Sequence, residues 1–319
     1  MAVQAHPDLE VAYRILREEA GVAERGARSC LDVTGPDAVE FLQGQVTNDV
    51  EALEPGRGCY ALLLNPKGRI LADMRVLMRS AEELSLDGDA VAMETVAANL
   101  RTYKIGRKVE ISPSPDRKVI SVIGPKAREL LGLDPLSDEN AFVEGDGNGA
   151  KLLAVATDAG VDLLFPASEP AVVEQLIAGI QPVSEDAAEV LRIERGRPRF
   201  GIDMSDENLP GELGLEERAV SFTKGCYVGQ EPVARMHHRG HPNRHLRGLA
   251  LTQPAATGEP VTSGDGDGAG EVGRVGSTAV SPALGPIALA LIRREVEVGA
   301  QVLAGGGPAK VVRLPFGTE

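Results

Sequence analysis

Apolar residues recur along the chain with two different spacings, and the change between them divides the sequence into two regions. Tyr60–Leu64 and Ile70–Met78 are short, largely apolar runs, so they predict two strands joined by a tight turn at Asn65-Pro66-Lys67-Gly68. From Val172 to Ile180 the apolar residues recur at three and four residues, which predicts an amphipathic helix. After about residue 246, short apolar runs alternate with Gly/Pro-rich turns, which predicts a small closed or sandwiched β domain. These runs are Leu246–Leu251, Ile287–Ile292 and Val311–Leu314.

An internal repeat indicates how the first region is built. Val33–Leu42 and Val122–Leu131 each contain a short apolar stretch, a Gly-Pro step and a segment with helical apolar spacing. Proline suits the first position of a helix, where its missing N–H is not needed. The two copies predict two related α+β halves, with a chance similarity of two helix starts as the alternative. A chain of 319 residues exceeds what one core usually supports. We therefore expect two similar halves over residues 1–240, divided near 110–120, and a β domain over residues 241–319.

Composition and charge exclude several classes of protein. A hydrophobic content of 43% with 25% charged residues is typical of a folded globular chain. Residues 1–20 carry scattered charges and no apolar core, and no stretch approaches the ~20 apolar residues of a membrane span. The net charge of −14 argues against tight nonspecific binding of nucleic acid. Three cysteines without a CxxC spacing favour reduced thiols and a cytoplasmic location.

The run Lys224-Gly225-Cys226-Tyr227-Val228-Gly229-Gln230-Glu231 is the most informative motif. It places a cysteine between two glycines, beside a lysine and a tyrosine, in a segment without a clear helical or strand period. A lysine near a thiol favours the thiolate, so Cys226 is a candidate nucleophile. The alternative is a small buried side chain in a tight turn.

Glu194 interrupts the apolar face of a predicted helix. Ser184 is a plausible N-cap, and Ala187, Val190 and Leu191 form a stripe whose continuation includes Glu194. A buried carboxylate needs hydrogen-bond donors. These come either from the arginines at 192, 195, 197 and 199 or from a ligand, and the sequence leaves both alternatives open.

Asp73 presents a similar choice within the predicted strand Ile70–Met78. It is either an outward, solvated carboxylate or, if its face lines a cleft, a group for acid–base chemistry or for holding an amine.

Four of the five histidines lie in the segment 237–245. The spacing of four among His237, His241 and His245 would suit a zinc site on a helix. Because Gly240 and Pro242 interrupt such a helix, we expect no metal site. With Arg235, Arg239, Arg244 and Arg247 nearby, the segment is interpreted as an anion-facing loop or, alternatively, as a solvated linker. Asp265-Gly266-Asp267-Gly268 lacks the ligand series of a calcium loop and predicts a turn.

Taken together, these residues resemble the YgfZ-type folate-binding proteins, relatives of the T-protein (aminomethyltransferase) of the glycine cleavage system. The motif Lys224–Glu231 is characteristic of the YgfZ branch. The resemblance covers nearly the whole chain through further blocks at Phe41–Val50, Leu64–Asp73, Arg192–Pro198 and Ser281–Ala290.

The resemblance implies a ring of three domains around an opening where tetrahydrofolate, or a one-carbon derivative of it, binds. By the resemblance, Glu194 holds the pterin ring, and Asp73 matches the catalytic aspartate of the transferases. We expect Lys224, Tyr227, Arg235 and Arg239 to contribute to the same site. Family members are linked to maintenance of iron–sulfur enzymes and to the tRNA modification that depends on them.

The sequence therefore predicts a tetrahydrofolate-binding accessory factor that supports iron–sulfur cluster assembly or repair and dependent tRNA modification, with Cys226 as the reactive group. Its expected partners are folate, iron–sulfur proteins or their assembly machinery, and tRNA-modifying enzymes. The alternative is a folate-dependent aminomethyltransferase that uses Asp73. An RNA-binding module is a third interpretation, which the acidic charge disfavours.

Overall fold

The computed structural model describes residues 8–26, 28–114, 116–133, 136, 138–147, 150–264 and 270–318. The chain divides into two compact units. The first comprises the residues up to Asn65, Leu71–Ala188 and Arg218–Val228. The second comprises Pro66–Ile70, Glu189–Glu217 and the residues from Gly229 onward. Each unit is described by itself below.

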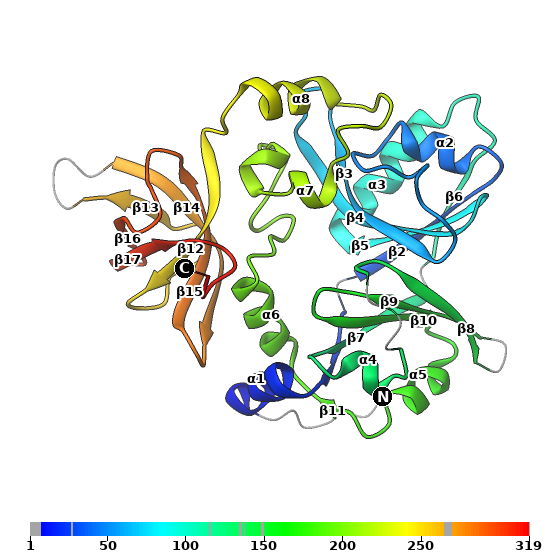
Figure 1. Ribbon diagram of the computed structural model, residues 1–319, viewed down its shortest axis with the longest axis horizontal. Helices are drawn as coiled ribbons and strands as arrows, with labels where there is room; N and C mark the ends of the chain where they lie inside the picture. The colour runs from blue at the N-terminus through cyan, green and yellow to red at the C-terminus, as the bar shows by residue number, and fades with distance from the viewer. Residues whose placement is uncertain are drawn as a thin grey trace. The chain divides into compact units, whose positions relative to one another are not determined.

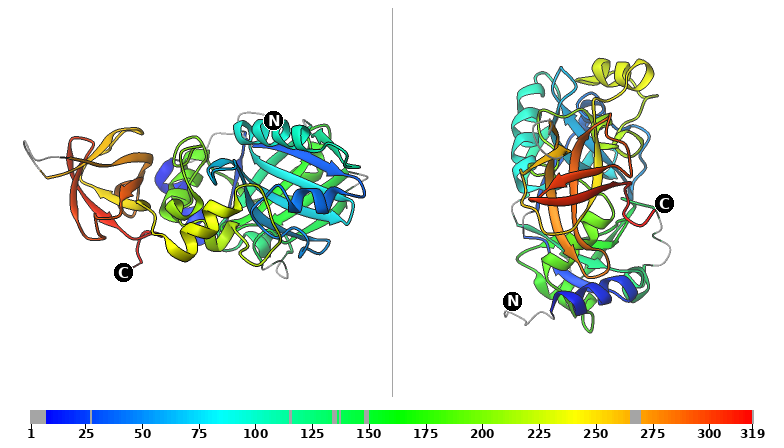
Figure 2. Two further views of the ribbon diagram at one scale, coloured as in Figure 1. Left: turned by 90° about the horizontal axis from the view of Figure 1, so that it is seen from above. Right: turned by 90° about the vertical axis from the view of Figure 1, so that its left-hand side faces the viewer.

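The first unit contains a five-stranded sheet whose strand order is β3-β4-β5-β2-β6 (Figure 1). The strands β3, β4 and β5 form an antiparallel meander, and β5 then pairs with β2. Helix α3 (Ala90–Tyr103) packs across β2, β5 and β6 and covers one face of this sheet, as Figure 2 shows. The strands are β2 (Arg28–Thr34), β3 (Arg57–Leu64), β4 (Ile70–Ser80), β5 (Glu83–Asp89) and β6 (Glu110–Pro113).

A six-stranded sheet in the same unit repeats this path, in the order β11-β1-β7-β10-β9-β8. Its meander β8-β9-β10 again ends beside the first strand of the half, β7, and helix α5 (Pro170–Leu176) packs on β10. This topology bears out the two related halves inferred from the internal repeat. The strands are β1 (Gly21–Glu24), β7 (Arg117–Ile123), β8 (Phe142–Gly147), β9 (Ala150–Ala156), β10 (Gly160–Pro166) and β11 (Gln181–Pro182), and α1 (Leu9–Glu18) precedes them.

The glycines of the two Gly-Pro steps occupy backbone positions that other residues rarely adopt. Gly35 and Gly124 follow β2 and β7 with φ of 120° and 135°, a region that side chains with a Cβ rarely occupy. A Cβ on Gly35 would lie 2.2 Å from the carbonyl oxygen of Lys108, and one on Gly124 would lie 2.4 Å from that of Glu19. Glycine is therefore required at both strand ends.

The repeated prolines take part in a turn rather than in a helix. Helices α2 (Ala38–Gln43) and α4 (Ala127–Leu130) begin two residues after Pro36 and Pro125. The N–H of Ala38 donates to the carbonyl of Gly35 at 3.0 Å, so Pro36 is the second residue of a β-turn. The prediction that proline is the first helical residue was wrong, because this turn is completed before the helix starts.

The two sheets of the first unit face each other across a shared core. Cys30 and Leu77 from the five-stranded sheet pack with apolar residues of the other sheet, among them Val119, Leu153 and Leu164. Within this core lies Arg75, which is on β4 and only 7% exposed.

Arg75 joins the two sheets through charge. Its Nη1 lies 2.8 Å from Oδ2 of Asp162 on β10, and its Nη2 lies 2.6 Å from Oδ2 of Asp87 on β5. Burial alone raises the pKa of Asp87, but Arg28 and Arg75 outweigh burial and hold that pKa well below its ordinary value. The two halves are therefore joined by a buried ion network as well as by apolar contact.

The second unit contains a closed six-stranded barrel in the order β12-β15-β14-β13-β16-β17 (Figure 1). Its interior is filled by small and branched apolar side chains such as Leu249, Val261 and Ile292. This confirms the expected C-terminal β-barrel. The strands are β12 (Arg244–Leu251), β13 (Pro260–Ser263), β14 (Gly270–Ser281), β15 (Gly285–Arg293), β16 (Gln301–Ala304) and β17 (Gly307–Val312).

Helical segments lie between the sheets and the barrel in the sequence. They are α6 (Glu185–Glu194), the 3₁₀ helix η1 (Pro210–Leu213), α7 (Glu216–Ala219) and α8 (Gln230–Arg239). Helix α8 was not predicted, and α5 ends at Leu176 rather than at Ile180, before the left-handed Gly179. The predicted turn at residues 265–268 lies outside the described residues. Within the described part of the chain, no helix combines the length and the apolar character needed to cross a membrane.

Candidate functional site

The loop that carries the cysteine motif is anchored by its lysine. Lys224 is 8% exposed, and its Nζ donates to the main-chain carbonyls of Gln43, Val46 and Asn48 at 2.7, 2.8 and 2.7 Å. An ammonium group has three N–H donors, so these carbonyls engage all of them. Burial lowers the pKa of Lys224 to about 8.

Main-chain bonds fix the same loop on both sides of the lysine. The N–H of Ser221 donates to the carbonyl of Thr47 at 3.0 Å, and the N–H of Val228 donates to that of Gly44 at 3.2 Å. The hydroxyl of Thr47 donates to the carbonyl of Ala219 at 2.6 Å. Two segments that are distant in the sequence, 43–48 and 219–228, therefore form one rigid element.

Tyr227 completes the anchoring. Its side chain is 7% exposed, and the Nζ of Lys224 lies 5.1 Å from the centre of its ring, in the range of a cation–π contact. Gly229 follows with φ of 82° and starts α8. Lys224 and Tyr227 therefore hold the loop in place. That they also contact folate remains a prediction.

Cys226 is the exposed thiol between these two buried anchors. Cys30 is buried, and burial raises the pKa of both Cys30 and Cys59 to about 12. Of the three cysteines, Cys226 is therefore the most exposed to solvent and partners. The alternative of a small buried side chain in a turn does not hold.

Asp73 lies on β4 with one oxygen bonded and the other unpaired. The hydroxyl of Tyr60 donates to Oδ2 of Asp73 at 2.8 Å, whereas Oδ1 is buried and without a hydrogen-bond partner. Burial raises the pKa of Asp73 to about 6, against the lowering effect of the Tyr60 bond. Asp73 is therefore not the solvated carboxylate of the first alternative.

A group of residues that the sequence analysis did not select holds Tyr60 in place. The guanidinium of Arg218 lies over the Tyr60 ring, 4.6 Å from its centre, and is itself bonded by Glu139. The side chain of Asn48 donates to the carbonyls of Tyr60 and Arg218 at 2.9 and 3.2 Å. Asn48 lay within a recognised sequence block, but nothing in the local pattern marked Arg218 or Glu139.

Asn48 also connects the Cys226 loop with the residues around Tyr60 and Asp73. Its main-chain oxygen accepts from Lys224, and its side chain contacts the Tyr60 strand. The loop that presents Cys226 and the strand that positions Asp73 therefore share one support within the first unit.

Glu194, in the second unit, ends α6 as predicted. The hydroxyl of Ser184 accepts from the N–H of Ala187 at 3.4 Å at the start of this helix, and Gly196 with φ of 68° follows its end. Glu194 is 6% exposed, and the hydroxyl of Ser281 donates to its Oε1 at 2.6 Å.

The basic candidates of the second unit lie on a helix. Arg235 and Arg239 are exposed on α8, and Arg235 pairs with Glu231 at 2.6 Å. The interpretation of this stretch as a loop was wrong up to Arg239, because the helix continues to that residue. His237 on α8 approaches Glu216 at 3.6 Å. Across the described ranges, no three His, Cys, Asp or Glu side chains gather in a way that would hold a metal ion.

The first unit thus combines two kinds of chemistry. A carboxyl group with a pKa near 6 exchanges protons close to neutral pH and has an oxygen available to a donor. An accessible thiol can act as a nucleophile or bind a soft metal.

A family model, two sequence relatives and one solved structure show which known proteins this chain is similar to. The GCVT N-terminal domain model matches residues 3–142. A protein named tRNA-modifying protein YgfZ, from Yersinia pseudotuberculosis, is 32% identical over 236 residues, covering 72% of this chain and 71% of its own. A protein named aminomethyltransferase, from Alcanivorax borkumensis, is 27% identical over 321 residues, covering 95% of this chain and 87% of its own. The crystal structure of glycine cleavage system aminomethyltransferase T from Bartonella henselae superposes with a TM-score of 0.85 at 23% identity, over 97% of this chain and 89% of that one, which shows a shared fold.

Proposed function

Because the chain belongs to the YgfZ family, whose members are related to the glycine cleavage T-protein, we propose that it is a folate-binding accessory factor in tRNA modification. In this proposal it binds tetrahydrofolate or a one-carbon derivative and supports the iron–sulfur enzymes on which the modification depends. The protein acts in the cytoplasm, where thiols stay reduced.

The anchored presentation of Cys226 carries the proposal. Lys224 and Tyr227 on either side of it are buried and bonded, while Cys226 itself is exposed. A loop held by three carbonyl contacts on one lysine keeps its thiol in a fixed position. Such a thiol suits transient attack on, or coordination of, a group that a partner protein supplies.

The acceptor groups fit a folate. A pterin ring presents adjacent N–H donors, which a single carboxylate accepts as a fork. Glu194 is a buried carboxylate at the end of α6, and the hydroxyl of Ser281 donates to its Oε1, which fixes the orientation of the group. Within the first unit, the unpaired Oδ1 of Asp73 can accept a hydrogen bond from an amine. Arg235 and Arg239 would receive anionic groups of the ligand or of a partner.

Calorimetric titration with a stable reduced folate tests the role of Glu194. We expect Glu194→Gln to weaken binding by at least about tenfold, since charge-assisted hydrogen bonds contribute ~1.5–3 kcal/mol each. Glu185→Gln, on the same helix, serves as the matched control and keeps the wild-type affinity. Equal affinity of wild type and Glu194→Gln would remove Glu194 from the site.

The accessory role is tested in cells that lack their own YgfZ protein. The chain is expressed there, and modified nucleosides in total tRNA are measured by mass spectrometry. Cys226→Ser is expected to abolish the restoration of modified nucleosides, whereas Thr223→Ala, an exposed position in the same loop, is expected to keep it. Full restoration by Cys226→Ser would contradict the proposal.

The second candidate is a folate-dependent aminomethyltransferase. The raised pKa of Asp73 and its unpaired oxygen favour it, since a carboxyl near neutral pKa suits proton transfer and an unpaired one suits an amine. Turnover of a methylamine-loaded carrier protein by wild type, lost in Asp73→Asn, would establish this activity. Absence of turnover in both proteins would favour the accessory role.

A further inference from the structure

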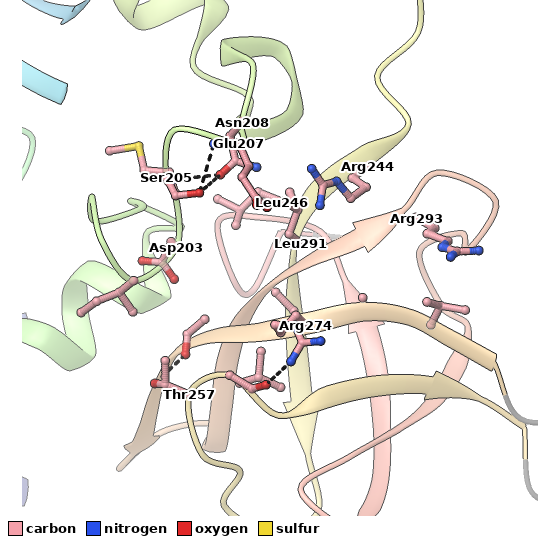
Figure 3. A pocket seen from close by; sticks show the side chains of 18 of the residues that line it. Asp203, Ser205, Glu207, Asn208, Arg244, Leu246, Thr257, Arg274, Leu291 and Arg293 are labelled. Carbon is pink, nitrogen blue, oxygen red and sulfur yellow. Dashed lines mark hydrogen bonds between the residues drawn. The ribbon is translucent and has the colours of Figure 1, made fainter. Parts of the chain in front are cut away.

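The arginines on the outer face of the barrel are already neutralised. A cavity on this face is lined by three of them, Arg244, Arg274 and Arg293 (Figure 3). Each contacts a carboxylate: Glu212 at 3.3 Å from Arg244, Glu271 at 2.8 Å from Arg274 and Glu295 at 4.0 Å from Arg293. This set of arginines therefore offers no surplus of positive charge to a ligand.

A second set of arginines lies at the end of the barrel where β12 begins and β15 and β17 end. Its members are Arg247, Arg294 and Arg313. Arg247 is paired with Ala290 across β12 and β15, and because Ala290 belongs to the barrel core, Arg247 shares the inward face. The register pairs Gly248 with Val312, so Arg313 follows beside Arg247. The N–H of Arg294 donates to the carbonyl of Asn243 at 2.9 Å, further along β12. These three arginines, the arginine row, therefore cross one end of the barrel.

The arginine row lacks the carboxylate partners of the outer set. Within the described ranges none of its three members forms an ion pair, and Nε of Arg247 is buried without a hydrogen-bond partner. Nη1 of Arg247 approaches the carbonyl of Leu246 at 3.5 Å. In the loop after β15, Glu295 is directed to Arg293, which leaves Glu297 as the other acidic residue of that loop. Among the side chains of β12, this loop and residue 313, three unpaired arginines therefore stand against one glutamate.

The pKa values show the same surplus. At Arg75, burial lowers the pKa, but Asp87 and Asp162 outweigh burial and raise the pKa above its ordinary value. At Arg247, burial lowers the pKa and the charge of Arg313 lowers it further. Burial and then Arg247 also lower the pKa of His245, two residues earlier on β12, and Glu212 offsets part of this. Around Arg247 the field is therefore positive, and at neutral pH it comes from the arginines rather than from the histidine.

An oxyanion would relieve this charge. Arg247 and Arg313 are neighbouring like charges, which repel each other until an anion lies between them. Guanidinium groups bind oxyanions in a bidentate manner. A phosphate monoester carries a charge of about −2 at neutral pH, so it neutralises both arginines, whereas a single carboxylate neutralises one.

We propose that the arginine row binds a phosphate monoester, with the dianionic group between Arg247 and Arg313 and with Arg294 adding to the attraction. The phosphate belongs either to a small phosphorylated metabolite or to the 5′-phosphorylated end of an RNA. This site takes no part in the proposed function.

Calorimetry with the full chain at pH 7.5 tests the proposal, with glycerol 3-phosphate, malonate and acetate as probes. We expect glycerol 3-phosphate to bind at least about tenfold more tightly than the two carboxylates. Arg247→Gln and Arg313→Gln are each expected to weaken its binding by about tenfold or more. Arg293→Gln is the matched control, because Arg293 is exposed, precedes Arg294 and is already paired with Glu295, and it should leave the affinity unchanged.

Thermal unfolding without ligand separates binding from a structural role. The charge of Arg247 is disfavoured in the free protein, so Arg247→Gln should melt at or above the temperature of wild type. A lower melting temperature of Arg247→Gln would mean that Arg247 supports the barrel and would overturn the proposal.

The competing results are distinct. Malonate that binds as tightly as glycerol 3-phosphate would overturn the phosphate, and absence of binding, or binding that survives both substitutions, would overturn the site. A short RNA that displaces glycerol 3-phosphate only when it is 5′-phosphorylated identifies RNA as the source, and failure of that RNA to compete identifies a small metabolite. Displacement by the RNA without its 5′-phosphate would overturn the monoester. Unchanged affinity for reduced folate in Arg247→Gln separates this result from the proposed function, whereas its loss would assign the arginine row to folate and contradict the proposal.

Discussion

The hydroxyl of Tyr60 donates a hydrogen bond of 2.8 Å to Oδ2 of Asp73, on the neighbouring strand of the five-stranded sheet. The Tyr60 ring is in turn covered by the guanidinium of Arg218 at 4.6 Å. One oxygen of the carboxyl is thus held, and the other, Oδ1, is buried without a partner. This arrangement orients a carboxyl group while leaving it able to accept a donor from a ligand.

Replacement of Asp73 by asparagine should stabilise the protein in a pH-dependent manner. Burial raises the pKa of Asp73 from 3.8 to about 6, so the native state favours the protonated form. The stability that Asp73 contributes is therefore present below about pH 4 and is lost as the pH rises through 6. Asparagine does not ionise. The unfolding free energy of Asp73→Asn minus that of wild type should therefore increase by about 2–3 kcal/mol from pH 4 to pH 7. Urea denaturation at several pH values measures the difference. Asp116→Asn, an exposed position, should show no such trend, and a flat difference for Asp73→Asn would refute the raised pKa.

Replacement of Lys224 by methionine should destabilise the first unit. The substitution keeps an apolar chain of similar length but leaves the carbonyls of Gln43, Val46 and Asn48 without their donor. Each buried polar group left unsatisfied costs ~1–3 kcal/mol, so we expect a loss of about 3 kcal/mol in the unfolding free energy. Lys118→Met, exposed on β7, should change it by less than ~0.5 kcal/mol. Equal effects of the two substitutions would show that the three carbonyl contacts do not anchor the loop.

Alkylation should distinguish the three cysteines. Iodoacetamide at neutral pH is expected to modify Cys226 in the native protein, because that thiol is exposed. Cys30 and Cys59 should remain unmodified, since burial raises the pKa of each to about 12 and thiolate is the reactive form. Intact mass should show one added group in the native state and three after denaturation. A native Cys226→Ser protein that still gains a group would contradict this assignment.

Removal of Arg75 should affect stability far more than removal of an exposed arginine. Arg75→Ala leaves Asp87 and Asp162 without the guanidinium that joins them, and such losses cost about 3–5 kcal/mol. Arg107→Ala breaks the exposed pair with Glu40 and should leave the unfolding free energy close to that of wild type. Thermal and urea unfolding of the two variants provide the comparison. A small effect at Arg75 would mean that water enters between the two sheets.

Local patterns alone predicted several features correctly. The repeated Gly-Pro steps marked two related halves, because a backbone with positive φ at Gly35 and Gly124 admits only glycine at low cost. The period of α6 placed Glu194 on a buried face, because a helix repeats every 3.6 residues whatever packs against it. The motif around Cys226 was visible in the sequence for the same reason, since its residues are contiguous.

Tertiary structure decided which atoms meet. Nothing near Lys224 in the sequence indicates that its ammonium binds three carbonyls of a segment far along the chain, and nothing near Arg218 indicates that it covers Tyr60. The exposure of Cys226 and the unpaired oxygen of Asp73 likewise depend on chain segments brought together by folding. Sequence periodicity reports the environment of a residue along its own element, whereas hydrogen bonds and pKa values depend on groups that arrive from elsewhere in the chain.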